Sequence, residues 1–197
     1  MKYFLFLLLV LPSKNFSQQI LSAIGDLNYP QNNVYYADLN NVLDPFVGTY
    51  LYTNGSTSFK IVLQKKTHSS VNNIYYEDML IGAYRYVKNG VETVNTLNDL
   101  TSVYADGTYY PISGRILMTG QILGCDDCSP NEKWIYGSIE DPNSGSVDNL
   151  FIMKRVINGQ EALKITIHHE MTSQPESSPA PLPISYPLGQ EFILVKQ

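Results

Sequence analysis

The sequence contains few of the residues from which catalytic and metal sites are built. Its 197 residues include two cysteines, three histidines and one tryptophan. Zinc would need two more ligands beside Cys125 and Cys128, and no nearby Cys or His supplies them. The histidines, His68, His168 and His169, are not accompanied by a serine in a nucleophile-elbow motif. The sequence therefore predicts no enzyme and no bound cofactor or metal.

Clusters of basic residues and long apolar segments are also missing. The formal net charge is −5, with 13 basic and 18 acidic residues. This balance argues against binding to nucleic acid or to an anionic membrane surface. Beyond residue 18 no segment approaches the roughly 18 apolar residues of a transmembrane helix, so we expect no transmembrane segment.

The N-terminus has the three-part layout of a secretory signal. Lys2 supplies a positive charge, the run from Tyr3 to Leu11 is apolar, and Pro12 ends it ahead of a polar stretch. The apolar run is too short to span a bilayer. We expect residues 1–18 to be a signal peptide, with the mature chain starting near Gln18 or Gln19; the alternative is a buried N-terminal strand or helix. The expected location is the periplasm, the outer-membrane surface or the extracellular medium.

Turn-forming residues divide the rest of the chain at short intervals. Asn-Gly pairs are typical of type I′ hairpin turns, because both residues tolerate positive φ. A stretch with proline and glycine also favours a turn. The candidate turns are Asn54-Gly55, Asn89-Gly90, Asp106-Gly107, Asn158-Gly159 and Asp141–Gly145.

Between these turns the hydrophobic pattern has a period of two, which is typical of half-buried strands. Phe59, Ile61 and Leu63 alternate with Lys60, Val62 and Gln64, and the segments around Leu163 and Phe192 behave similarly. The pattern predicts strands at about 47–53, 57–66, 73–88, 91–97, 112–123, 132–140, 148–157, 161–169 and 190–197.

These strands predict an all-β fold, an antiparallel up-and-down meander of eight or nine strands that forms a lipocalin-like barrel. A two-sheet β-sandwich is the alternative. Closure into a barrel is favoured because it removes exposed strand edges. Residues 19–40 are expected to be a linker with a short helix, and short helices are possible over 19–27 and 38–44. Residues 41–197 form the single β domain, with a proline-rich loop over 172–187.

The start of the first long strand resembles the lipocalin and wider calycin barrels. The resemblance rests on Gly48-Thr49-Tyr50, a Gly-X-aromatic opening that follows a short helical approach; tyrosine stands where tryptophan is usual. It implies a barrel that holds a small apolar ligand and has no shared catalytic site.

A second resemblance covers residues 38–100 most strongly. The stretches Phe46–Gly55, Thr57–Lys66 and Tyr76–Gly90 are similar to a family of secreted domains of unknown function from Bacteroidetes bacteria. The resemblance implies an exported protein of about this length. It implies no activity, ligand or site residue.

Cys125 and Cys128 are the strongest candidates for a specific chemical role. In an exported chain two cysteines at this spacing favour a small structural disulfide. Free thiols are the first alternative, and a redox or metal role is the second. The residues that follow read as a turn and a strand, so the helix N-terminus that activates a redox cysteine is not expected.

Tyrosine is abundant, with fifteen residues in the chain. In each of the doublets at 35–36, 75–76 and 109–110, one ring should enter the core and the other should face out. The outward rings, with Tyr84, Tyr86 and Trp134, are candidates for a surface that stacks on a sugar or an apolar ligand, and Tyr50 is a further candidate binding residue. The alternative is that these rings only pack the strands.

The sequence therefore predicts an exported, non-enzymatic binding protein whose partner is unknown. The first hypothesis is a small apolar molecule held inside the barrel. The alternative is a cell-envelope or surface interaction module that binds a glycan or a protein through exposed tyrosines.

Overall fold

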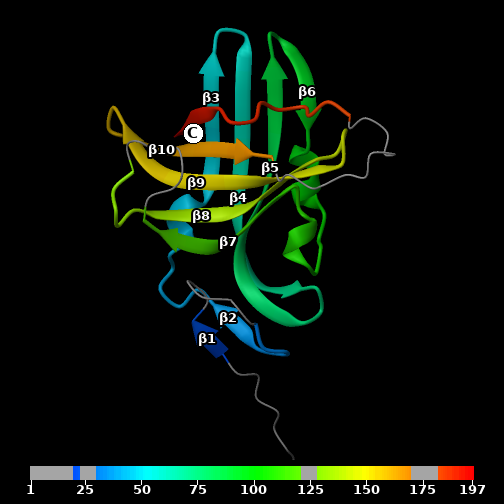
Figure 1. Cartoon of the computed structure of the whole chain (residues 1–197), viewed down its shortest axis with the longest axis vertical. Helices are drawn as coiled ribbons and strands as arrows, with labels where there is room; N and C mark the ends of the chain where they lie inside the picture. The colour runs from blue at the N-terminus through cyan, green and yellow to red at the C-terminus, as the bar shows by residue number, and fades with distance from the viewer. Residues whose placement is uncertain (1–19, 23–29, 121–127, 170–181) are drawn as a thin grey trace, which may run out of the picture.

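The computed structural model describes residues 20–22, 30–120, 128–169 and 182–197, and these residues are almost all strand and turn (Figure 1). The helical segments in this part of the chain are three short 3₁₀ turns, and none of its helices is long and apolar enough to cross a membrane. The elements are β1 Ile20–Ser22, β2 Tyr35–Ala37, η1 Asp44–Phe46, β3 Gly48–Asn54, β4 Thr57–Val71, β5 Tyr75–Lys88, β6 Val91–Asn95, η2 Leu97–Thr101, η3 Gly107–Tyr109, β7 Ile112–Thr119, β8 Lys133–Asp141, β9 Ser146–Ile157, β10 Gln160–His168 and β11 Glu191–Lys196.

Eight of these strands close into an antiparallel barrel. The ring runs β3-β4-β5-β7-β8-β9-β10-β11 and returns to β3. Two pairings complete the closure: β11 joins β3 at Val195 and Leu51, and β7 joins β5 at Ile112–Gly114. The predicted antiparallel barrel is confirmed, and the two-sheet sandwich is wrong because the β11–β3 pairing joins the last strand of the ring to the first.

The hairpin turns explain why consecutive strands lie side by side. Asn89-Gly90 and Asn158-Gly159 each have positive φ at both residues, as a type I′ turn requires. At the β3–β4 hairpin the two loop residues are instead Gly55-Ser56, with positive φ at Gly55 alone, which is the pattern of a type II′ turn. Asp106-Gly107 is not a hairpin turn but the start of η3.

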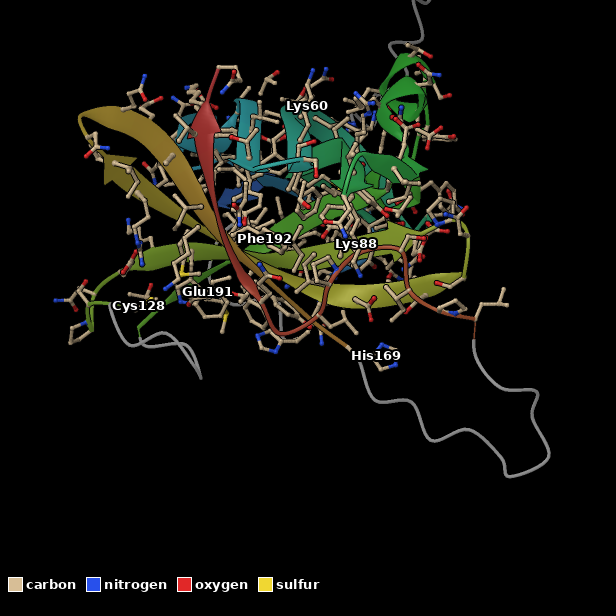
Figure 2. All side chains as sticks on the ribbon, turned by 90° about the horizontal axis from the view of Figure 1, so that it is seen from above. Lys60, Lys88, Cys128, His169, Glu191 and Phe192 are labelled. Atoms are coloured by element: carbon tan, nitrogen blue, oxygen red, sulfur yellow. The ribbon has the colours of Figure 1, made fainter. Side chains whose placement is uncertain are left out.

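The interior of the barrel is packed by the inward-facing residues of every strand. Phe59, Ile61 and Leu63 on β4 are fully buried, as their alternation predicts. Figure 2 shows Phe192 inside the ring of strands, next to the outward Glu191. The other members of this core come from the remaining strands and include Tyr50, Leu80, Tyr84, Ile112, Ile135, Ile139, Leu150, Ile152, Leu163, Ile165, Ile167 and Leu194.

Three short strands lie outside the ring. β6 pairs with the end of β5, and β2 pairs with the start of β5 in the parallel sense and carries β1 on its other side (Figure 1). Ile20–Ser22 and Tyr35–Ala37 are strands, so the linker with a short helix predicted for residues 19–40 is wrong within these described residues. The predicted signal peptide, residues 1–18, lies outside the described residues.

A buried carboxylate explains why residues 38–44 form a turn rather than the expected helix. Asp38 accepts hydrogen bonds from the backbone N–H groups of Val42 (2.8 Å) and Leu43 (3.0 Å) and forms an ion pair with Lys65 at 2.9 Å. Pro45 lies in the short 3₁₀ turn η1 that follows. The side chain of Asp38 thus takes the backbone donors that a helix would need.

Candidate functional site

Three of the predicted binding residues lie in the core instead of on the surface. Tyr50, Tyr84 and Tyr86 are buried and belong to the main core cluster. The hydroxyl of Tyr84 donates a hydrogen bond to the carbonyl oxygen of Glu140 at 2.6 Å, which allows this polar side chain to be buried. Burial raises the pKa of Tyr50 to about 12, and it also raises the pKa of Tyr84. The prediction that Tyr84 and Tyr86 face outward is wrong.

The tyrosine doublets behave as predicted. Tyr36, Tyr75 and Tyr110 are buried, whereas their neighbours Tyr35, Tyr76 and Tyr109 are partly or largely exposed. For the doublets on β2 and β5 this outcome follows from the alternation of side chains along an extended backbone, whereas Tyr109 ends the 3₁₀ turn η3.

Two of the outward rings, Tyr35 and Tyr76, contact His68 at a bulge in β4. The imidazole of His68 stacks on Tyr76 with ring centroids 4.3 Å apart, and it meets Tyr35 edge-on at 4.7 Å. His68 has φ of +51° at the register shift between Lys66 and Ser69. This cluster is a small aromatic surface built from β2, β4 and β5.

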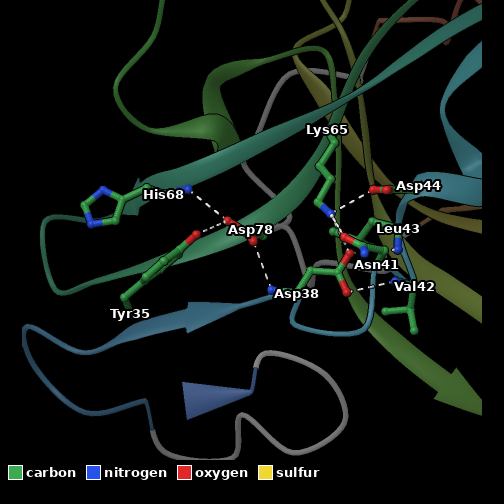
Figure 3. A network of polar contacts seen from close by, with 9 residues as sticks. All are labelled: Tyr35, Asp38, Asn41, Val42, Leu43, Asp44, Lys65, His68 and Asp78. Atoms are coloured by element: carbon green, nitrogen blue, oxygen red, sulfur yellow. Dashed lines mark hydrogen bonds and ion pairs between the residues drawn. The ribbon is translucent and has the colours of Figure 1, made fainter. Parts of the chain in front are cut away.

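The buried carboxylate of Asp78 holds this cluster together (Figure 3). It accepts hydrogen bonds from the Tyr35 hydroxyl at 2.6 Å and from the backbone N–H groups of His68 and Asp38, both at 2.9 Å. Burial, followed by the hydrogen bond to Asp78, raises the pKa of Tyr35 to about 12. These contacts attach β2 to the barrel, so we assign them a structural role.

A larger aromatic surface lies on the outside of β8, β9 and β10, and it contains the fourth predicted residue. We call it the outer aromatic face: Trp134, Tyr136, Phe151 and His168. Phe151 is at its centre, with ring centroids 5.5 Å from Trp134, 5.4 Å from Tyr136 and 5.4 Å from His168. Tyr136 and Phe151 are half-buried and His168 is exposed, whereas Trp134 is buried.

Polar side chains form a second row beside these rings. In strand register Tyr136 lies opposite Phe151, and Phe151 lies opposite Thr166. In the same way Ser138 lies opposite Asn149, and Asn149 lies opposite His168. The hydroxyl of Tyr136 donates to Asn149 Oδ1 at 2.6 Å, which links the two rows. The face thus combines ring surfaces with hydroxyl, amide and imidazole groups.

Tyr136, Phe151 and Asn149 were not predicted from the sequence. Period-two alternation places Trp134 and Tyr136 on one face of a strand, which is a usable signal. Their pairing with β9 depends on the turn at residues 142–145, because Asp141 pairs with Ser146 across it. The predicted turn at Asp141–Gly145 is therefore the sequence feature that places β9 beside β8.

Cys128 lies at the edge of the outer aromatic face. It is buried in a cluster with Trp134 and Met153, and its sulfur is 3.4 Å from the sulfur of Met153. Cys125 lies outside the described residues, so the Cys125–Cys128 disulfide stays a prediction.

The two adjacent histidines point to opposite faces, as predicted. His168 is exposed on the outer face, whereas His169 Nδ1 lies 2.6 Å from the buried carboxylate of Asp148. Among the residues that the structure describes, no group of three or more His, Cys, Asp and Glu side chains is arranged to hold a metal ion.

The fold and these surfaces define a class of protein: a closed eight-stranded antiparallel barrel with a packed interior and an aromatic surface on its outer wall. The chain belongs to a family of unknown function (DUF6705), whose pattern matches residues 1–197. No curated protein and no solved structure matches the chain.

Proposed function

We propose that this protein is an exported, non-enzymatic binding protein that recognises a saccharide through its outer aromatic face. One observation supports this function above the others. Two neighbouring rings, Tyr136 on β8 and Phe151 on β9, lie beside a row of hydrogen-bonding side chains that crosses β8, β9 and β10.

This arrangement suits the two kinds of surface that a sugar ring presents. The C–H groups of a sugar form an apolar face that packs on an aromatic ring, here Phe151 or Tyr136. Its hydroxyls surround that face and need donors and acceptors, which Asn149, Ser138 and His168 can supply. A protein partner would need about 800 Å² of contact surface, and half-buried rings interrupted by polar groups suit it less well.

The interior of the barrel is a poorer candidate for the ligand site. An eight-stranded barrel has room either for its own side chains or for one small ligand. Here the large rings of Tyr50, Phe59, Tyr84 and Phe192 lie inside and are fully buried. This packing favours a ligand site on the outer wall over the site expected from the sequence, in which a small apolar molecule would lie inside the barrel.

A glycan array with the purified chain tests the proposal, followed by calorimetry with the glycan that binds best. We expect Phe151→Ala and His168→Ala each to weaken binding at least tenfold, which corresponds to about 1.4 kcal/mol. The matched control is Tyr109→Ala, since Tyr109 is a largely exposed ring (66%) at the end of η3.

Retained binding in both face variants would contradict the proposal, and so would an array with no bound glycan. Phe151 is half-buried, so its replacement can also lower stability. His168 is exposed, and its variant separates lost binding from lost folding.

A further inference from the structure

Glu77 is an anomaly in the hydrogen bonding of the barrel wall. Its side chain is buried, with 1% exposed. Among the residues that the structure describes, its Oε1 is the one buried side-chain nitrogen or oxygen without a hydrogen bond. Buried polar atoms almost always have a partner, so such an exception calls for a physical reason.

The nearest opposite charge is Arg115, but the contact is loose. Arg115 Nη1 lies 3.5 Å from Glu77 Oε1 and donates its hydrogen bond to the Tyr75 hydroxyl at 2.9 Å instead. One third of the Arg115 side chain is exposed to solvent. The pair therefore gives ionised Glu77 less compensation than a hydrogen-bonded salt bridge would.

Glu77 lies where the edge of β5 changes partner. Its backbone pairs with Tyr36 of β2 on one side and with Ser69 of β4 on the other. From Leu80 onward the same edge of β5 pairs with β7, whose last residue in that pairing is Gly114. Arg115 comes next, at a shift in register of β7. The ion pair thus joins two barrel strands, β5 and β7, next to the point where β2 pairs with β5.

Burial is the main reason that Glu77 favours its neutral form, and the charged groups around it act in both directions. Arg115 approaches from β7, Asp106 from the segment before η3, Asp78 and Tyr75 from β5, and Tyr36 from β2. Ser69, its partner on β4, does not titrate. Burial raises the pKa of Glu77 to about 7; Arg115 opposes this shift, and the negative charges of Asp106 and Asp78 add to it.

We propose that Glu77 acts as a proton-sensitive clasp in the pairing of β2 with β5: the pairing holds while Glu77 is neutral and loosens when the buried carboxylate, poorly compensated by Arg115, is ionised. Loosening separates Tyr36 from Tyr75, whose rings meet edge-on at 5.6 Å in a small cluster with Val34 and Val71. The clasp therefore controls the exposure of a buried apolar cluster near neutral pH. It does not depend on the proposed saccharide site.

Hydrogen exchange in the full chain tests the clasp. We expect the exchange protection of the backbone amides at Tyr36 and Tyr76, corrected for the intrinsic rate, to fall about tenfold between pH ~6 and pH ~8. Amides in β9 and β10 should show no such change. Glu77→Gln should abolish the pH dependence at β2, and the control Glu92→Gln, at an exposed ion pair with Arg85, should retain it.

Protection at β2 that does not change with pH would overturn the clasp, as would a pH dependence that survives Glu77→Gln. If the Glu77→Gln variant does not fold, a titration of the wild-type chain still tests the proposal. The carboxyl carbon of Glu77 should titrate in NMR with a midpoint near the expected value of about 7. A midpoint close to the ordinary value of 4.5 would refute the proposal.

Discussion

The imidazole of His169 and the carboxylate of Asp148 lie 2.6 Å apart, with half of the histidine exposed and the aspartate completely buried. The other oxygen of Asp148 accepts a hydrogen bond from the hydroxyl of Tyr186 at 2.8 Å. Tyr186 belongs to the described end of the proline-rich loop, residues 182–187, and its ring is in the main core. The buried carboxylate of Asp148 on β9 therefore helps to fasten the segment that leads into the closing strand β11.

Removing the hydroxyl of Tyr186 should weaken this attachment. Tyr186→Phe keeps the ring in the core but leaves Asp148 Oδ2 with one fewer donor, so we expect a loss of about 1–3 kcal/mol. Urea denaturation followed by fluorescence measures this loss. The control Tyr109→Phe removes a hydroxyl from a largely exposed ring and should change stability little. Equal effects of the two variants would show that Asp148 does not depend on Tyr186.

Acid should destabilise the turn that holds β2 to the barrel. Burial by itself would raise the pKa of Asp38, but the N–H groups of Leu43 and Val42 and the ammonium of Lys65 outweigh it and lower the pKa. A carboxyl with a lowered folded-state pKa contributes stability above its unfolded value of about 4, and this contribution is lost as the pH falls through the folded value.

Asp38→Asn should therefore lower stability at neutral pH and flatten the acid side of the stability profile. Part of the dependence of stability on acid pH should remain in this variant, because the pKa of Asp106 is also lowered. Denaturation midpoints measured between pH ~2 and pH ~6 test this expectation. A variant whose profile runs parallel to that of the wild type would exclude a role for Asp38 in the acid response.

The cysteine pair should be oxidised in protein recovered from outside the cytosol. A thiol-reactive probe should label neither Cys125 nor Cys128 until a reductant is added. Because the loop between them is very short, reduction should cost less than the typical 2–4 kcal/mol. Labelling without reductant would show that both cysteines are free thiols.

Export itself is directly measurable. Protein recovered from the periplasm, cell surface or medium should begin near Gln18 or Gln19 by N-terminal sequencing. An intact N-terminus on protein recovered from the cytosol would contradict the signal-peptide prediction.

The sequence predicted most of the strand order because it depends on local signals. The exception is β6, which was expected within the meander but lies outside the ring, so that β5 pairs with β7. Hairpin turns such as Asn89-Gly90 and Asn158-Gly159 place each strand beside the next, and alternation assigns Phe59 and Leu163 to one buried face. The last strand then only has to meet the first for the ring to close.

The surface tyrosines were harder to predict because β5 is buried on both sides. Tyr84 and Tyr86 share the inner face with Leu80, but Met79 and Ile81 on the outer face are also buried. They pack against Tyr110, Tyr104 and Leu100 from the connection between β6 and β7. With apolar residues on both faces, alternation along β5 does not show which face points inward. The electrostatic surroundings of Glu77 likewise depend on residues distant in the sequence, Arg115 and Asp106.

The most direct test of the account is NMR shift mapping with the glycan that gives the strongest array signal. We expect the largest changes in amide and side-chain shifts at Tyr136, Asn149, Phe151 and His168, while the rings of Tyr84 and Phe192 inside the barrel remain unchanged. Shifts concentrated on Tyr84 and Phe192 would place the ligand inside the barrel and contradict the account.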